Sequence, residues 1–400
     1  MTSAVQDLAA VPSNDELIAQ AAALVPLLRA NSAQADRERR VPKENIDALQ
    51  ASGILRSTRP VQHGGSEIDP VAKNAMMAAL AEGCGSTAWV ATLLADGAFL
   101  ASKFPDDVQA EVFADPNSHV TATLIAAGRA ERDGTGFRVT GKWPFNTGCL
   151  HAQWVAEPAV IELEAGQPEV CFFLMRYSEL TILDDWDVSG LRGTGSNTVV
   201  GENVHVPQER MIRLAEAKDG TCFSDLNQVK PLYRIPPVPY IMTSASATFP
   251  GLAKAAYDLF VDKLPTRGPI AYTGYTQRSE APFTHHQVAE VALKMECANY
   301  LSSNATETVW HKAVNNEAYN SAELPKIWGQ VSYATRLFAE AIEVLRVSSG
   351  AHGIYNAQPM SQIARDAMAL STHAAMMPTT GVEHYGRSIC GLGPSTPWLS

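Results

Sequence analysis

The chain has 400 residues, of which 46% are hydrophobic and 18% are charged, and its formal net charge is −11. This length and composition are sufficient for a large core divided into two or three packed units. The acidic net charge, and the absence of a basic stripe interleaved with aromatic residues, argue against nucleic acid as a partner. The sequence contains no run of eighteen apolar residues that could cross a membrane.

Cysteine usage and the N-terminus narrow the class further. The six cysteines are scattered without a C-x-x-C pair, which argues against a zinc site or a disulfide framework and favours free thiols. The N-terminus carries Asp7 and lacks a basic region followed by an apolar stretch, so we expect no secretory signal and a cytoplasmic location. No H-E-x-x-H motif or facial carboxylate set accompanies a histidine, so we expect no metal.

Residues 1–118 are predicted to form an N-terminal helical domain. Ser13, with Glu16 three residues later, is typical of a helix N-cap, and apolar residues follow at helical spacing until the segment 37–42 interrupts them. Glycine and proline then punctuate the chain and separate further helices, which are predicted over residues 43–52, 70–83 and 86–104.

The pattern changes from residue 119, where β-branched and aromatic residues alternate with polar ones. It predicts a central β-domain over residues 119–228, with strands at 121–124, 136–141, 154–161, 170–176 and 198–206. The segment 218–233 is predicted to be a mobile connection. Long helical periodicities then return and predict a C-terminal helical bundle over residues 229–400, with helices at 247–262, 287–313 and 325–348.

Two short segments of the predicted β-domain combine glycines with aromatic and hydroxyl residues. The first reads G-K-W-P-F-N-T-G at residues 141–148, and the second reads W-D-V-S-G-L-R-G-T-G-S-N-T at residues 186–198. Closely spaced glycines permit positive φ and close backbone approach to a flat ligand. Either segment alone could be an ordinary turn, but their occurrence in order within one domain indicates a shared site.

Together the two segments resemble the β-domain signatures of the acyl-CoA dehydrogenase-like flavoproteins. The order of helices, sheet and helices agrees, so the resemblance covers residues 15–395. It implies an α+β fold with an N-terminal helical domain, a central β-barrel or sandwich and a C-terminal four-helix bundle. It also implies a flavin in the cleft between the β-domain and the bundle, and a homotetramer.

The residues after Arg365-Asp366 bear on the reaction type. Many dehydrogenases of this family place a carboxylate base there, whereas this chain has no Asp or Glu between residues 367 and 380 and carries His373 beside that position. A histidine there resembles the oxygenase components of two-component (group D) flavin monooxygenases, such as the 4-hydroxyphenylacetate and steroid-phenol hydroxylases. Its ordinary pKa suits a group that shares the proton of a phenol near pH 7. The alternative is a packed histidine on an apolar helix face.

The resemblance therefore implies a monooxygenase that takes reduced FMN or FAD and O2. It would insert one oxygen atom into an organic substrate, expected to be aromatic or phenolic, through a C4a-hydroperoxyflavin. The chain has no G-x-G-x-x-G fingerprint for a nicotinamide dinucleotide, so a separate NAD(P)H-dependent flavin reductase is expected as a partner. The alternatives are an acyl-CoA dehydrogenase with a relocated base, an N-oxygenase of an amino sugar or an S-oxygenase on the same fold, and an inactive scaffold.

The same resemblance assigns cofactor contacts. Thr147 would place its hydroxyl near flavin N5 and C4a, where it acts against loss of hydrogen peroxide. The second signature brings backbone N–H groups toward anionic groups of the cofactor. The further residues expected to contact the cofactor are Trp143, Phe145, Asn146, Arg192 and Ser196, together with Arg278, which resembles an arginine that reaches the FAD diphosphate from a neighbouring subunit.

Three residues are expected to meet the substrate. Trp89 lies in G-S-T-A-W, which resembles the start of a pocket-lining helix in the oxygenases, and His119 stands at the beginning of the β-domain. His373 is expected to orient or deprotonate the substrate.

Overall fold

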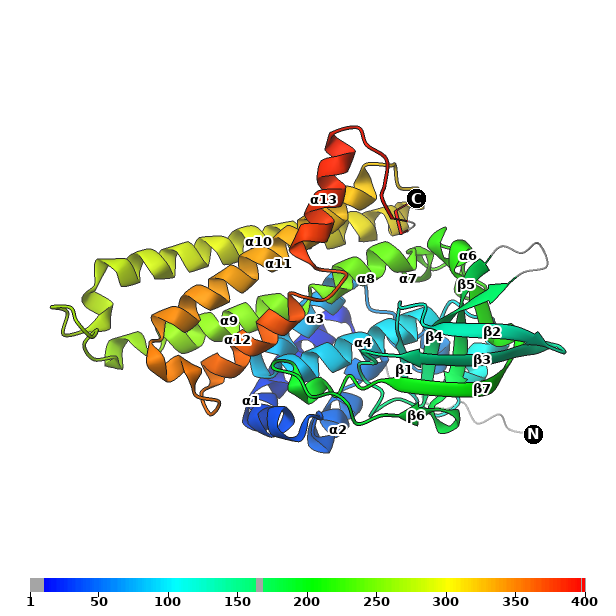
Figure 1. Cartoon of the computed structure of the whole chain (residues 1–400), viewed down its shortest axis with the longest axis horizontal. Helices are drawn as coiled ribbons and strands as arrows, with labels where there is room; N and C mark the ends of the chain where they lie inside the picture. The colour runs from blue at the N-terminus through cyan, green and yellow to red at the C-terminus, as the bar shows by residue number, and fades with distance from the viewer. Residues whose placement is uncertain (1–10, 163–167, 397, 400) are drawn as a thin grey trace.

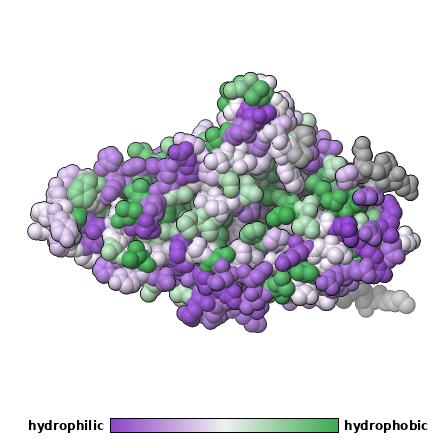
Figure 2. All heavy atoms as spheres, viewed as in Figure 1, coloured by the Kyte–Doolittle hydropathy of each residue, from purple (hydrophilic) through white to green (hydrophobic). Residues whose placement is uncertain are grey.

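The computed structural model describes residues 11–162, 168–396 and 398–399. Figure 1 shows an elongated molecule with the β-domain at one end and long helices extending to the other. The helix α4 lies in the middle, between the N-terminal helices and the sheet. Figure 2 shows hydrophilic side chains gathered over α1 and α2 at the lower edge of this face, and apolar ones along its middle.

The N-terminal helices begin and end as local signals predict. The Ser13 hydroxyl accepts the Glu16 N–H at 3.3 Å, and the Glu16 carboxylate accepts the Ser13 N–H at 2.8 Å, which is the capping box of the first helix. This helix ends where Arg39 adopts a φ of 52°. The helices are α1 (Asn14–Glu38), α2 (Lys43–Ala51), α3 (Pro70–Gly83), α4 (Gly85–Ala101) and α5 (Asp106–Val112).

The described strands form one mixed sheet in the order β6-β7-β3-β2-β4-β5-β8, and β1 pairs with β4 outside this path. Both β1 and β2 run parallel to β4, whereas the other pairs are antiparallel. The strands are β1 (Val120–Ala122), β2 (Gly128–Asp133), β3 (Gly136–Trp143), β4 (Trp154–Glu162), β5 (Pro168–Arg176), β6 (Thr181–Ile182), β7 (Val199–Pro207) and β8 (Met211–Arg213).

The strand β4 is buried along most of its length because separate apolar clusters cover its two faces. Val155 and Ala159 belong to the cluster around Trp143, whereas Trp154 and Ala156 belong to a cluster with α4 and α5. A polar residue in the middle of this strand, such as Glu157, is therefore withdrawn from water.

The C-terminal helices form a bundle in which α9, α10, α11 and α12 lie side by side, while α13 stands away from the body and packs on α11 (Figure 1). The helices are α6 (Leu214–Lys218), α7 (Pro231–Arg234), α8 (Pro237–Ala245), α9 (Thr248–Val261), α10 (Pro282–Asn315), α11 (Glu323–Ser348), α12 (Pro359–Leu370) and α13 (Pro378–Ile389). Among the described residues, none of these helices is long and apolar enough to cross a membrane.

The segment 218–233 differs from the mobile connection that its composition predicts. Ser224 and Asn227 are fully buried. The Asn227 side chain donates to Ser102 O at 3.0 Å and to the Gln109 side chain at 2.9 Å. These hydrogen bonds tie the segment to α4 and α5, because a buried amide must find partners.

Candidate functional site

The first signature forms a strained loop at the end of β3. Phe145 has a φ of 62°, a region that bulky residues rarely occupy, and its ring is 63% exposed and edge-on to Trp186 at 6.0 Å between centroids. Gly148 has a φ of 87°, and a Cβ there would lie 3.1 Å from Leu94 of α4. The loop therefore lies against α4 and presents an aromatic ring outward.

The Thr147 hydroxyl joins the two signatures. Its Oγ1 lies 2.7 Å from Ser196 Oγ, which in turn lies 2.7 Å from Thr194 Oγ1. Ser196 follows a short 3-10 helix, η4 (Arg192–Thr194), that the second signature forms. The structure thus brings together two segments that the sequence separates by about forty residues.

Close packing holds the second signature in place. A Cβ on Gly190 would lie 1.9 Å from Arg365 O, so only glycine fits there. The Leu191 N–H donates to Asp366 Oδ1 at 2.6 Å. Arg192 donates to Val188 O at 2.6 Å and to Asp36 O at 3.2 Å. The Arg192 guanidinium therefore holds its own loop against α1, and its direct contact with the cofactor stays a prediction.

His373 follows the end of α12 and is partly buried beside Trp89, with the two rings edge-on at 5.2 Å. Its Nδ1 accepts the Ala375 N–H at 3.3 Å, which leaves Nε2 to carry the proton of the neutral ring. Burial lowers the pKa of His373 to about 4. The near-neutral pKa on which the sequence argument rested is therefore not the pKa of this folded state, and the ring is uncharged at pH 7.

The helix α4 connects His373 to the loop around Thr147. Trp89 meets His373 and Leu94 meets the loop at Gly148, and five residues of helix separate Trp89 from Leu94 by about 7.5 Å along the axis. The histidine and the loop that carries Thr147 therefore both lie against α4, about one and a half turns apart.

Two residues expected at the flavin are turned inward instead. Trp143 has no exposed surface and donates through Nε1 to Pro158 O at 2.9 Å. Asn146 is also fully buried, and its amide donates to Glu157 while its Oδ1 accepts the Tyr177 hydroxyl at 2.9 Å. Both side chains are buried beneath the loop, so the exposed Phe145 and the largely buried Thr147 hydroxyl remain as candidates to contact a ligand.

The buried carboxyl of Glu157 is a residue that sequence reasoning missed. It accepts hydrogen bonds from Asn146 and from the Thr123 hydroxyl, and burial raises its pKa to about 8. One signal was available, since a glutamate within the apolar run of β4 requires a buried partner. Asn146, the unusual member of the first signature, is that partner.

His119 has different surroundings from the other expected substrate residues. It is buried at the start of β1, and its pKa is lowered to about 4 by burial and by the nearby Arg59. Its charged neighbours are Arg59, Arg56 and Asp115, on the side of the N-terminal domain. We therefore separate His119 from the candidate site around Trp89 and His373.

Arg278 lies in the connection between α9 and α10, at the end of the bundle away from the β-domain (Figure 1). It donates to Ser348 O and lies near Arg267, which donates to Ser349 Oγ at 3.4 Å. Burial and the neighbouring Arg278 lower the pKa of Arg267. Arg278 Nε and Arg267 Nη1 are buried without a hydrogen-bond partner. Such a pair of partly buried cations, each with an N–H group that has no partner within the chain, suits an anion.

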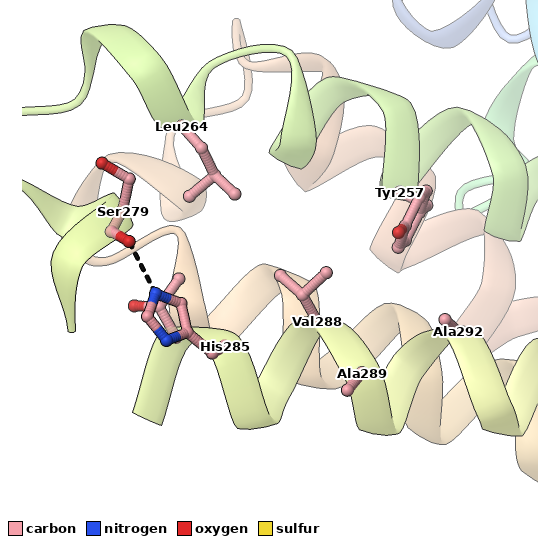
Figure 3. A pocket seen from close by; sticks show the side chains of 8 residues that line it. Tyr257, Leu264, Ser279, His285, Val288, Ala289 and Ala292 are labelled. Atoms are coloured by element: carbon pink, nitrogen blue, oxygen red, sulfur yellow. Dashed lines mark hydrogen bonds between the residues drawn. The ribbon is translucent and has the colours of Figure 1, made fainter. Parts of the chain in front are cut away.

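A cavity of about 250 Å³ lies between α9 and the start of α10, and Ser279, the neighbour of Arg278 in the chain, is among its lining residues. Figure 3 shows its apolar wall, formed by Tyr257, Leu264 and Val288, and its polar end, where His285 Nε2 lies 2.7 Å from Ser279 O. His285 is exposed.

The two clusters fit different parts of a flavin nucleotide. The exposed Phe145 ring and the Thr147 hydroxyl suit a flat ring with a polar edge, and the Arg267–Arg278 pair suits a phosphate. Within one chain the two clusters are far apart, at the middle and at the end of the molecule (Figure 1). A single flavin that meets both kinds of group would take them from two copies of the chain.

Comparison with known proteins identifies the class. The family model described as acyl-CoA dehydrogenase, N-terminal domain, matches residues 20–109. A second family model, described as acyl-CoA dehydrogenase, C-terminal domain, matches residues 243–378. These matches and the mixed sheet between helical domains confirm the predicted α+β, acyl-CoA dehydrogenase-like fold.

Individual relatives narrow the class further. The chain is 30% identical to the oxygenase subunit of a flavin-dependent monooxygenase from Rhodococcus jostii, over 92% of this chain and 97% of the relative. It is also 30% identical to the oxygenase component of an FADH2-dependent resorcinol hydroxylase from a Rhizobium species, over 94% and 95%. Two solved structures are similar. XiaF from a Streptomyces species in complex with FADH2 and glycerol has a TM-score of 0.89 and 30% identity, over 96% of this chain and 97% of that chain. The 3-HSA hydroxylase from a Rhodococcus species has a TM-score of 0.90 and 29% identity, over 97% of this chain and 100% of that chain.

The chain therefore belongs to the oxygenase components of the flavin-dependent monooxygenases. It is an oxidoreductase that uses reduced flavin and O2 on a small-molecule substrate, which confirms the predicted activity. As an oxygenase component, it depends on a separate flavin reductase.

Proposed function

We propose that this oxygenase hydroxylates a phenol or a closely related aromatic compound beside His373. The observation that carries the proposal is the Trp89–His373 pair, which lies along α4 from the Thr147 hydroxyl. An aromatic wall beside a polar ring nitrogen suits a flat substrate that carries a hydroxyl group. The names of relatives agree, since they include the resorcinol hydroxylase and a p-hydroxyphenylacetate 3-hydroxylase from Acinetobacter baumannii, which is 25% identical over 93% of this chain.

In this proposal Thr147 and Phe145 contact the flavin ring, and Ser196 supports Thr147. When bound, the reduced flavin supplies the electrons with which one atom of O2 enters the substrate and the other leaves as water. Arg278 contacts the phosphate end from a second copy of the chain. Either FMN or FAD satisfies these contacts, because both carry the same ring and at least one phosphate.

His373 acts in this proposal as a hydrogen-bond donor and not as a base. Its protonated form has a pKa of about 4, whereas a phenol has a pKa of about 10, as tyrosine does. A neutral imidazole of this kind would hold only a small fraction of the phenol's protons. Its Nε2–H can instead donate to the substrate oxygen, which orients the ring and favours the phenolate.

A homotetramer is part of the proposal. Large apolar side chains are exposed on the bundle, among them Leu293 and Tyr300 on α10 and Tyr333 and Val347 on α11. Leu293 and Tyr300 are seven residues apart and so lie on one face of their helix. Exposed apolar groups on one helix face indicate contact with another protein surface, and the placement of Arg278 calls for a second copy. The cytoplasmic location stays a prediction.

The test is to mix the purified chain with reduced FMN or reduced FAD and O2, and to supply a panel of phenols, indoles, thiophenes and amino sugars. We expect hydroxylated product from a phenol, with little hydrogen peroxide. Product from an amino sugar or a thiophene, and none from any phenol, would contradict the proposed substrate class. Size and mass measured by light scattering would test the tetramer.

A further inference from the structure

Three hydroxyl groups form a chain that ends at a backbone carbonyl. Thr147 Oγ1 lies 2.7 Å from Ser196 Oγ, Ser196 Oγ lies 2.7 Å from Thr194 Oγ1, and Thr194 Oγ1 lies 2.9 Å from Leu191 O. The exposed fractions of Thr147, Ser196 and Thr194 are 7%, 3% and 0%. Bulk water therefore has little access to the chain and cannot readily replace its hydrogen bonds.

The carbonyl determines the direction of every hydrogen bond in this chain. Leu191 O can only accept, so the single proton of the Thr194 hydroxyl points to it. Ser196 must then donate to Thr194, and Thr147 must donate to Ser196. The Thr147 oxygen is left with lone pairs only on its remaining side.

We propose that Thr194 and Ser196 are positioning residues that hold the Thr147 hydroxyl as a hydrogen-bond acceptor and thereby select reduced over oxidised flavin. The inference rests on the proposed contact between Thr147 and flavin N5. Reduced flavin carries a proton on N5 and can donate to Thr147, whereas oxidised flavin carries only a lone pair there. An acceptor facing an acceptor is repulsive, so the oxidised ring loses a hydrogen bond that the reduced ring gains.

This selection suits an oxygenase that receives its flavin from a separate reductase. The oxidised flavin that leaves the enzyme after turnover would otherwise compete for the same site. An acceptor-only Thr147 also retains the N5 proton of the reduced ring, and the wasteful release of hydrogen peroxide removes that proton.

The packing indicates that the hydroxyl chain can be altered without loss of the fold. Leu191 O also accepts from Trp186 Nε1 at 3.1 Å and from the Thr194 N–H at 3.1 Å. Replacing Thr194 with valine keeps the shape of the side chain and leaves this carbonyl satisfied. Ser196 then has no acceptor in Thr194 and can donate to Thr147, which releases the Thr147 proton toward the flavin.

The experiment measures the dissociation constants of oxidised and anaerobically reduced FMN and FAD for the full-length chain. We expect wild type to bind the reduced form more tightly. The ratio of the two constants should fall about tenfold in Thr194→Val and in Ser196→Ala, which corresponds to about 1.4 kcal/mol and is near the net value of one hydrogen bond. Thr194→Ser should restore the wild-type ratio because it keeps the hydroxyl.

Thr92→Val is the matched control. Thr92 is fully buried on α4, as Thr194 is in its loop, but its hydroxyl donates to Ala88 O of its own helix at 2.9 Å. The ratio should not change in this variant. Circular dichroism and melting in the absence of flavin establish that each variant is folded, and Ser196→Ala decides the matter if Thr194→Val does not fold.

Thr147→Val separates failure of this inference from failure of the proposed flavin contact. If Thr147→Val changes the ratio while Thr194→Val and Ser196→Ala keep the wild-type value, the direction of the hydroxyl chain is wrong but the flavin contact stands. If Thr147→Val also leaves both constants unchanged, Thr147 does not face N5 and the proposed contact is wrong as well.

Discussion

Asp366 is a buried carboxyl beneath the second signature, and its replacement by asparagine should stabilise the protein above neutral pH. It is 2% exposed, and its Oδ1 accepts the Leu191 N–H at 2.6 Å. Burial raises the pKa of Asp366 to about 7. The nearby Asp36 also raises this pKa, whereas Arg365 lowers it. Asparagine keeps the oxygen that accepts from Leu191 but carries no charge, so it avoids the cost of a buried carboxylate.

The sign follows from the two pKa values of Asp366. The unfolded chain has an Asp pKa of about 3.9 and the folded protein has one of about 7, so the folded state binds more protons between these values. The free energy of unfolding therefore falls as pH rises from about 4 to about 7, by about 4 kcal/mol in all. Between pH 5 and pH 8, the advantage of Asp366→Asn over wild type should grow by roughly 2 to 3 kcal/mol.

The measurement is urea unfolding of wild type and Asp366→Asn at pH 5, 6.5 and 8, without flavin. Asp47→Asn is the control, because Asp47 is exposed and pairs with Lys43 at 2.7 Å on the surface of α2. Its stability should run parallel to that of wild type at all three values. If the curve for Asp366→Asn also runs parallel to wild type, the carboxyl is ionised in the folded protein and the reasoning from its burial is refuted.

Three further predictions concern the site. His373→Ala should lower the product yield about tenfold and raise hydrogen peroxide release, whereas His373→Gln should keep part of the yield through its amide N–H. Because the pKa of His373 is lowered, the wild-type yield should show no step from this residue between about pH 6 and 9. Wild-type yields in both variants would exclude His373 from substrate binding. Burial raises the pKa of Glu157 to about 8, so its negative charge appears only above that pH. Any loss of flavin affinity as pH rises through about 8 should therefore be absent in Glu157→Gln, and a loss that persists in the variant would point to another group. Arg278→Ala should weaken binding of reduced FAD about tenfold but leave riboflavin, which has no phosphate, unaffected; equal losses for both would place Arg278 outside a phosphate site.

Local patterns were sufficient for most of the architecture, and the exceptions have physical reasons. Ser13 and Glu16 predict the start of the first helix, because the capping box involves only residues that are close together in the chain. The strand β2 was missed because its inward positions include Gly128 and Ala130, which carry little hydrophobic signal. A Cβ on Gly128 would lie 2.5 Å from the Trp143 ring, so the tryptophan of another strand fills the space that a larger side chain would occupy.

The site was predicted only in part, for a similar reason. The two signatures indicated a common site, and the structure joins them through Thr147 and Ser196. The pattern did not reveal that Trp143 and Asn146 turn inward, because their partners Pro158 and Glu157 lie on a different strand.

The sequence by itself determined most of the long helices and strands, the order of the two signatures, and the absence of an acidic residue from positions 367–380 around His373. These properties depend on residues close together in the chain. Only the tertiary structure decided the lowered pKa of His373, the raised pKa of Asp366 and the hydrogen-bond partner of the Thr147 hydroxyl. Each of these depends on burial and on partners from distant segments, because a proton's position is set by the groups that surround it in space.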